Sequence, residues 1–216
     1  MDVLFALILL MQSFFQPDAE ADSTQIGMIR AMLTNSVQPG GDGMQSGQPD
    51  GGQGETADPQ PDAPKIKGIY VTAYSAGGAR MQELLDLVDR TELNAMVIDI
   101  KDDLGHITYK SDNPELAKYG SSQSYIKDIG KLMDTLRERD IYPIARIVVF
   151  KDSVLAKKRP DLSFLNPDGS IWQNSNKDHF VNPYVREVWE YNVAVAEEAA
   201  RLGFREIQFD YVRFPE

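Results

Sequence analysis

An alternation of strand-like and helix-like segments, beginning at Lys65, constrains the fold of this chain more than any other feature. Short, mostly apolar segments are predicted to be strands at residues 66–73, 95–100, 142–150 and 206–212. No hairpin turn is evident between these segments. Such an alternation predicts a parallel sheet with right-handed crossovers, either an open doubly wound sheet or a closed eight-stranded barrel.

Amphipathic helices are predicted between the strands. Apolar residues recur at the spacing i, i+3, i+4, i+7 from Met81 to Val88, which is typical of a helix with one buried face. Residues 125–136 carry a second stripe of this kind. A third helix is predicted to open at Asn182-Pro183, a capping residue followed by proline, and to end at Gly203.

The N-terminal part of the chain has a different composition. An uncharged apolar run at residues 3–11 and the sequence Ala19-Glu20-Ala21 predict a signal peptide or membrane anchor over residues 1–21. No lysine or arginine precedes the run, so a buried amphipathic segment is the alternative. Residues 22–64, rich in Gly, Pro, Gln and Asp, are expected to form a disordered linker. This organisation predicts a secreted or cell-envelope protein whose folded part is residues 65–216.

Composition and missing motifs exclude several classes of function. The chain has no cysteine, which removes disulfides, thiolate nucleophiles and cysteine-ligated metals. Its net charge of −11 disfavours nucleic acid as a partner. The turn after the first strand, residues 73–78, holds only an adjacent pair of glycines and no nucleotide-binding motif. We therefore predict no cofactor.

Polar residues cluster at the carboxyl ends of the predicted strands, where parallel α/β folds bind their ligands. Asp210 lies inside an apolar strand, and alternation places it with Gln208 and Val212 on the face that would line a barrel. A catalytic role for Asp210 and a structural ion pair with Arg146 or Arg213 both remain open. The other candidates, as substrate contacts, are Tyr74, Asp99, Lys101, Asp102, Arg146, Asp152 and Arg213.

The long loop at residues 151–181 supplies a further candidate, Trp172, whose ring would suit the apolar face of a sugar. Packing of the loop onto the fold is the alternative role for this tryptophan. The aspartates of the second strand, Asp99, Asp102 and Asp103, could hold a hard cation or form a solvated loop. A barrel hydrolase that uses a metal on these aspartates is therefore a third hypothesis for the function.

Several segments resemble a bacterial family catalogued as a "putative glycoside hydrolase domain", a (β/α)8 barrel distantly similar to the alpha-amylase clan. The matching segments are Lys67–Ala73, Val97–Asp103, Val181–Trp189 and, most specifically, Glu206–Pro215. The resemblance implies that Asp210 is the nucleophile and that a carboxylic acid at the end of a fifth strand protonates the leaving group. Gln208 departs from the clan, which has arginine at this position.

The resemblance also implies a barrel of about 250 residues, whereas residues 65–216 hold only about the first four β/α units. We therefore expect the chain to be a fragment without the second catalytic carboxylate, inactive alone. The leading hypothesis is a glycosidase that hydrolyses a cell-wall or extracellular polysaccharide, with retention of configuration, through carboxylate chemistry. The alternative is a non-catalytic carbohydrate-binding or scaffold barrel of the cell envelope.

Overall fold

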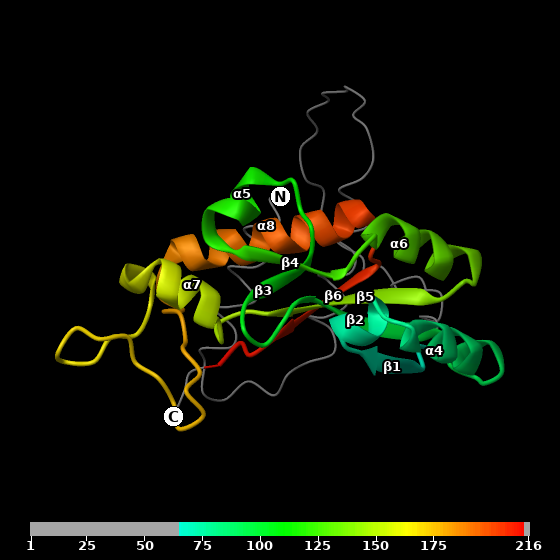
Figure 1. Ribbon diagram of the computed structural model, residues 1–216, viewed down its shortest axis with the longest axis horizontal. Helices are drawn as coiled ribbons and strands as arrows, with labels where there is room; N and C mark the ends of the chain where they lie inside the picture. Colours follow the sequence, from blue (N-terminus) through cyan, green and yellow to red (C-terminus); the bar gives the residue numbers. More distant parts are fainter. Residues whose placement is uncertain (1–64, 214–216) are drawn as a thin grey trace, which may run out of the picture. The chain divides into compact units, whose positions relative to one another are not determined.

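The computed structural model describes residues 65–213, in which helices pack against a mixed sheet (Figure 1). Its elements, in chain order, are β1 Gly68–Val71, α3 Ala73–Ala76, α4 Arg80–Asp89, β2 Ala95–Lys101, β3 His106–Tyr109, α5 Pro114–Tyr119, β4 Ser121–Ile126, α6 Ile129–Glu138, β5 Tyr142–Val148, α7 Ser153–Lys158, the 3-10 helix η1 Pro160–Leu162, α8 Arg186–Leu202 and β6 Glu206–Asp210. The predicted leader and linker, residues 1–21 and 22–64, lie outside the described residues.

The central sheet has the predicted parallel architecture. Strands β1, β2, β5 and β6 are neighbours in this order, and every pair among them is parallel. Each of the four strands predicted from the sequence corresponds to one of these; β1, β5 and β6 are shorter than predicted, and β2 is one residue longer. The sheet therefore confirms the predicted α/β fold, with four successive parallel strands of the barrel type.

Burial differs between the middle and the outer strands of this parallel set. On β2, Met96, Ile98 and Ile100 are fully buried, as expected for a strand covered on both faces. On β6 no residue is fully buried, and Gln208 is exposed. β1 and β6 are the outermost of the four parallel strands in residues 65–213, so their side chains have fewer neighbours.

A segment between β2 and α6 departs from the predicted alternation. β3 pairs antiparallel with the end of β2, and β4 pairs parallel with β3, so a short hairpin, α5 and a further strand precede α6. The prediction of no hairpin between strands is thus wrong. The predicted helix at residues 125–136 is also too long, because Tyr125 and Ile126 belong to β4. α6 begins after Asp128, whose side chain accepts a hydrogen bond from the Lys131 amide.

A β-bulge near the end of β2 decides which face its last residues occupy. Asp99 lies opposite Arg146 on β5, but Lys101 lies opposite the very next residue, Ile147. The extra residue on β2 turns Lys101 to the face opposite that of Asp99. One face thus carries Asp99 and Arg146, while the other receives Lys101 and packs against α8, whose Asn192 bonds the Lys101 ammonium.

The long helix α8 packs along β5 and β6 through a buried stripe that includes Val188, Val195 and Ala199 (Figure 1). The helix begins at Arg186, three residues after the predicted start. The Asn182 side chain accepts a hydrogen bond from the Tyr184 amide and so closes a turn before the helix. The predicted end is confirmed, since Gly203 adopts the left-handed conformation (φ 102°) that favours glycine.

Among residues 65–213, no helix combines the length and the apolar composition that crossing a membrane requires.

Candidate functional site

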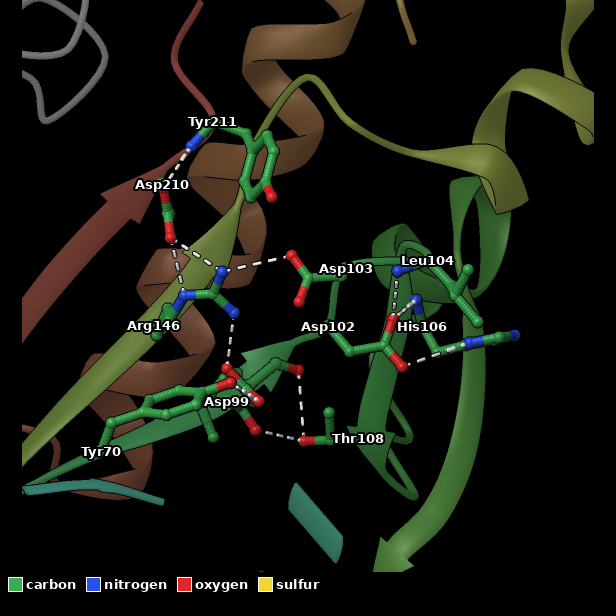
Figure 2. A network of polar contacts seen from close by, with 11 residues as sticks. Tyr70, Asp99, Asp102, Asp103, Leu104, His106, Thr108, Arg146, Asp210 and Tyr211 are labelled. Carbon is green, nitrogen blue, oxygen red and sulfur yellow. Dashed lines mark hydrogen bonds and ion pairs between the residues drawn. The ribbon is translucent and has the colours of Figure 1, made fainter. Parts of the chain in front are cut away.

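Arg146 on β5 is the centre of a cluster of charged residues at the carboxyl end of the sheet. Figure 2 shows its guanidinium group between three aspartates that come from three different segments. Nε donates to Asp210 Oδ2 at 2.8 Å, and Nη1 donates to Asp99 Oδ1 at 2.8 Å. Nη2 lies 2.7 Å from Asp210 Oδ2 and 3.2 Å from Asp103 Oδ1. The guanidinium therefore ties together the ends of β2, β5 and β6.

The buried half of the cluster consists of Arg146, Asp99 and Tyr70. The Tyr70 hydroxyl donates to Asp99 Oδ2 at 2.6 Å, and the Arg146 guanidinium lies 5.5 Å from the centre of the Tyr70 ring. Burial raises the pKa of Asp99, although the hydrogen bonds from Tyr70 and Arg146 oppose the shift. Burial and the hydrogen bond to Asp99 raise the pKa of Tyr70. Both partners of Asp99 thus stabilise its carboxylate form against the cost of burial.

Hydrogen bonds to the aspartates also raise the pKa of Arg146, although burial acts in the opposite direction. The guanidinium therefore stays charged and can fix the orientation of all three carboxylates.

Asp210, the residue predicted to be catalytic, ends β6 and reaches solvent. Its side chain is 39% exposed, whereas that of Arg146 is 9% exposed. Its second oxygen, Oδ1, accepts a hydrogen bond from the amide of Tyr211, a non-glycine residue with a positive φ of 52°. Both oxygens of Asp210 are thus held by the protein, and the predicted ion pair with Arg146 is present.

The cluster has an excess of negative charge. A single arginine contacts three aspartates, and two of these carboxylates, Asp103 (47%) and Asp210 (39%), are exposed. Asp103 Oδ1 and Asp210 Oδ2 both pair with Arg146 Nη2, so these two oxygens lie close to each other. The cluster therefore presents two neighbouring carboxylates to any molecule that binds this end of the sheet.

Lys101 and Asp152, both predicted to bind substrate, form a separate ion pair on the opposite face of β2. Their side chains are fully buried, with Lys101 Nζ 2.7 Å from Asp152 Oδ2. Nζ also donates to the Val148 carbonyl and to Asn192 Oδ1 on α8. Asp152 caps α7 through the Leu155 amide. This burial corrects the expectation that Lys101 and Asp152 contact a substrate, because neither side chain reaches solvent in this structure.

Asp102 organises the turn that joins β2 to β3. Its Oδ1 accepts hydrogen bonds from the amides of Leu104 and His106 at 2.9 and 2.8 Å, and its Oδ2 lies 3.3 Å from the His106 ring (Figure 2). Gly105 has a φ of 98°, and a Cβ there would lie 1.9 Å from Asp152 Oδ1. Asp102 therefore shapes the loop that carries Asp103, and this turn packs directly on the buried ion pair.

The remaining predicted residues lie in three surroundings. Tyr74, 66% exposed, stacks on Tyr125 with ring centres 4.4 Å apart. A side-chain hydrogen bond with Tyr74, with partial burial, raises the pKa of Tyr125 to about 12. Trp172 packs edge-on against Phe180 within the long loop, which agrees with the packing role. Arg213 is exposed, and its guanidinium lies 5.5 Å from the Tyr211 ring.

No metal site is evident in residues 65–213, which contain no suitable group of three or more His, Cys, Asp or Glu side chains. The aspartates of the second strand are already committed, Asp99 and Asp103 to Arg146 and Asp102 to its turn. Tyr70 is a site residue that the sequence analysis missed. Strand alternation could have identified it, because Tyr70 occupies one face of a predicted strand whose end carries Thr72.

Comparison with known proteins identifies the family of this domain. The sequence model of a family described as "Putative glycosyl hydrolase domain" matches residues 68–216. The chain is 39% identical in sequence to a hypothetical protein from Ruminiclostridium thermocellum whose crystal structure is known. The match covers 68% of this chain and 78% of that protein, with a TM-score of 0.65. No protein of curated function matches the sequence significantly.

Among enzymes of known structure, the fold resembles a maltogenic alpha-amylase from Thermotoga neapolitana with a TM-score of 0.51 and 15% identity. That match covers 70% of this chain but only 40% of the amylase. An alpha-galactosidase from Thermus thermophilus matches with a TM-score of 0.44 and 19% identity over 62% of this chain and 28% of the enzyme. At such identities, the likeness to the amylase supports the barrel-type fold alone.

Proposed function

The chain belongs to the family of glycosyl hydrolase-like domains whose model matches residues 68–216, and from this premise we propose that it hydrolyses glycosidic bonds. The observation that supports the proposal most is Asp210: a half-exposed carboxylate at the carboxyl end of a parallel strand, oriented by a buried arginine. Active sites of barrel enzymes lie at this end of the strands. The match spans only 40% of the amylase that the fold resembles, so hydrolysis is a proposal for this chain and is not carried over from that enzyme.

Asp210 is proposed to be the nucleophile of a retaining reaction. One of its oxygens attacks the anomeric carbon, the bond to the leaving oxygen breaks, and that oxygen takes a proton from a second carboxylic acid. Water then attacks the anomeric carbon of the glycosyl ester, gives its proton to the carboxylate formed from that acid, and releases Asp210. Arg146 holds Oδ2 through Nε and Nη2 while lone pairs remain for the attack. The acid would lie about 5–5.5 Å away across the scissile bond.

The proposed substrate is a polysaccharide of the cell wall or extracellular space. This part of the proposal rests on the apolar run at residues 3–11 and the Ala19-Glu20-Ala21 sequence, which suit export, and on the linker at residues 22–64. A linker of this composition would let the folded unit reach an extended polymer while its N-terminus stays attached or is cleaved.

Replacement of Asp210 tests the proposal. Asp210→Asn is expected to lower turnover of an aryl glycoside by roughly three to five orders of magnitude while oligosaccharide binding persists. In Asp210→Gly, added azide should restore cleavage of an activated aryl glycoside, because the azide occupies the vacated position and the phenolate leaves without an acid. The expected product is a glycosyl azide of inverted anomeric configuration. Turnover that is equal in wild type and Asp210→Asn would refute the role.

Binding without turnover in either protein would instead support the non-catalytic carbohydrate-binding alternative. Arg137→Gln is a suitable control, because Arg137 pairs with Asp134 on exposed α6 and leaves the Arg146 cluster untouched.

A further inference from the structure

A cluster of aromatic rings lies beside the Arg146 cluster and has no role in the proposed bond cleavage. Tyr74 follows β1 on the short helix α3, Tyr125 lies near the end of β4, and His106 begins β3. The rings of Tyr74 and Tyr125 lie 4.4 Å apart with a tilt of 38°, and the His106 ring meets Tyr125 edge-on at 6.4 Å. We propose that these three rings form a binding subsite for an uncharged pyranose ring of the substrate.

The backbone around these rings is built for their close approach. A Cβ on Gly77 would lie 1.7 Å from the Tyr125 carbonyl oxygen, so only glycine lets the end of α3 pack on β4. Thr72 caps α3 by accepting a hydrogen bond from the Ser75 amide, and this fixes the turn that carries Tyr74. Tyr74 is 66% exposed although its neighbours are fixed. A large ring held rigidly at the surface loses little conformational entropy when a ligand stacks on it.

The three rings are linked to the proposed site of cleavage through a single turn. The turn of Asp102 connects the two, because Asp102 holds the His106 ring and amide while the next residue, Asp103, bonds Arg146 (Figure 2). The segment that inserts β3, α5 and β4 between β2 and α6 supplies His106 and Tyr125. A polysaccharide bound at Asp210 would thus extend over these rings, so the inference rests on the proposed function.

The charges nearby select the kind of sugar. Asp103 and Asp210 are exposed carboxylates, and within residues 65–213 the only basic group paired with them, Arg146, is shared with Asp99. A uronic acid or sulfated sugar would bring a further negative charge to carboxylates that already exceed their cation, which is unfavourable. An uncharged pyranose, with apolar C–H faces for stacking and hydroxyls for the carboxylates, meets no such penalty.

Binding measurements on the full-length protein carrying Asp210→Asn, which removes turnover, test the subsite. The probes are maltohexaose, cellohexaose and chitohexaose as uncharged oligosaccharides, and oligogalacturonate of the same length as the charged comparison. Saturation-transfer NMR titration should detect binding of at least one uncharged probe and weaker binding of oligogalacturonate. Adding Tyr74→Ala should weaken that binding roughly tenfold, whereas Tyr74→Phe, which keeps the ring, should retain it.

Tyr142→Ala is the matched control and should leave binding unchanged, because Tyr142 is a tyrosine at the amino end of β5, the end of the parallel strands opposite the proposed site. The subsite is refuted if Tyr74→Ala binds as tightly as Tyr142→Ala, if oligogalacturonate binds as tightly as the uncharged probes, or if no uncharged probe binds. The proposed hydrolysis fails separately, through unchanged turnover in Asp210→Asn. Loss of binding in Tyr74→Ala would therefore support the subsite even if no turnover were found.

Discussion

Two ion-pair clusters lie at the same end of the sheet but on opposite faces, and they differ in balance and exposure. In the first, Lys101 and Asp152 match one cation with one anion, both fully buried. In the second, Arg146 faces three carboxylates, two of them exposed. A balanced, sealed pair can only support the fold, whereas an excess of exposed, oriented carboxylates can act on a ligand. Charge balance and solvent access, rather than position at a strand end, therefore distinguish the structural pair from the cluster that is proposed to be functional.

The largest expected effect on stability comes from the buried pair of Lys101 and Asp152. Lys101→Met leaves the buried Asp152 without its cation, and the free energy of unfolding should fall by about 3–5 kcal/mol. Urea denaturation followed by circular dichroism measures this loss. The double variant Lys101→Met/Asp152→Asn removes the buried charge while the asparagine can still cap α7, so it should recover a large part of the loss. No recovery would mean that packing, not the unpaired charge, accounts for the effect.

The sequence predicted the parallel strands, because apolar runs are local signals, and it gave Arg146 as one of two possible ion-pair partners of Asp210. It could not assign Lys101 to the correct face, since the β-bulge after Asp99 arises from pairing with β5, far away in the chain. The strand β4 was also missed. Its first residues, Ser121 to Ser124, show no apolar alternation, and it is a strand only because it pairs with β3.

Tyr70 shows a different limit of prediction from the sequence. Its residue type and strand are plain from the sequence, but its hydrogen bond to Asp99 depends on the register between β1 and β2. Charge at a strand end is a local signal that singles out Asp99, whereas nothing local marks the neutral hydroxyl of Tyr70 that stabilises it. Charged residues at strand ends are thus easier to nominate than the neutral residues that hold them in place.

Replacing Arg146, the centre of the cluster with three aspartates, is the second test of the comparison. Arg146→Lys keeps the charge but cannot bond three aspartates in three directions, so Asp210 loses its orientation. Turnover should fall about a hundredfold, while the free energy of unfolding falls by only about 1–2 kcal/mol. Steady-state kinetics and urea denaturation of the same preparations separate the two effects. If Arg146→Lys lost as much stability as Lys101→Met and kept normal turnover, the Arg146 cluster would have a structural role as well.

The smallest effect is expected at Tyr70 and depends on pH. Tyr70→Phe removes one hydrogen bond to the Asp99 carboxylate and should cost about 1 kcal/mol of stability at neutral pH. Because burial raises the pKa of Asp99, the folded protein holds this proton more tightly than the unfolded chain does. Asp99 therefore contributes a loss of stability as the pH rises from the ordinary range of an aspartate through its raised folded pKa. The hydrogen bond from Tyr70 opposes that loss of stability. Removing the hydrogen bond should therefore make the loss larger.

The difference in unfolding free energy between wild type and Tyr70→Phe is thus expected to be small in acid, where Asp99 is protonated in both proteins, and to grow toward neutral pH. Urea denaturation at a series of pH values measures it, and Tyr142→Phe, at the other end of the sheet, is the control, because the Tyr142 hydroxyl donates to the backbone carbonyl of Arg205. A difference that stays constant with pH would show that the Tyr70 hydroxyl does not act through the charge of Asp99. The aspartates of the Arg146 cluster would then be oriented by Arg146 alone, as Asp152 is by Lys101.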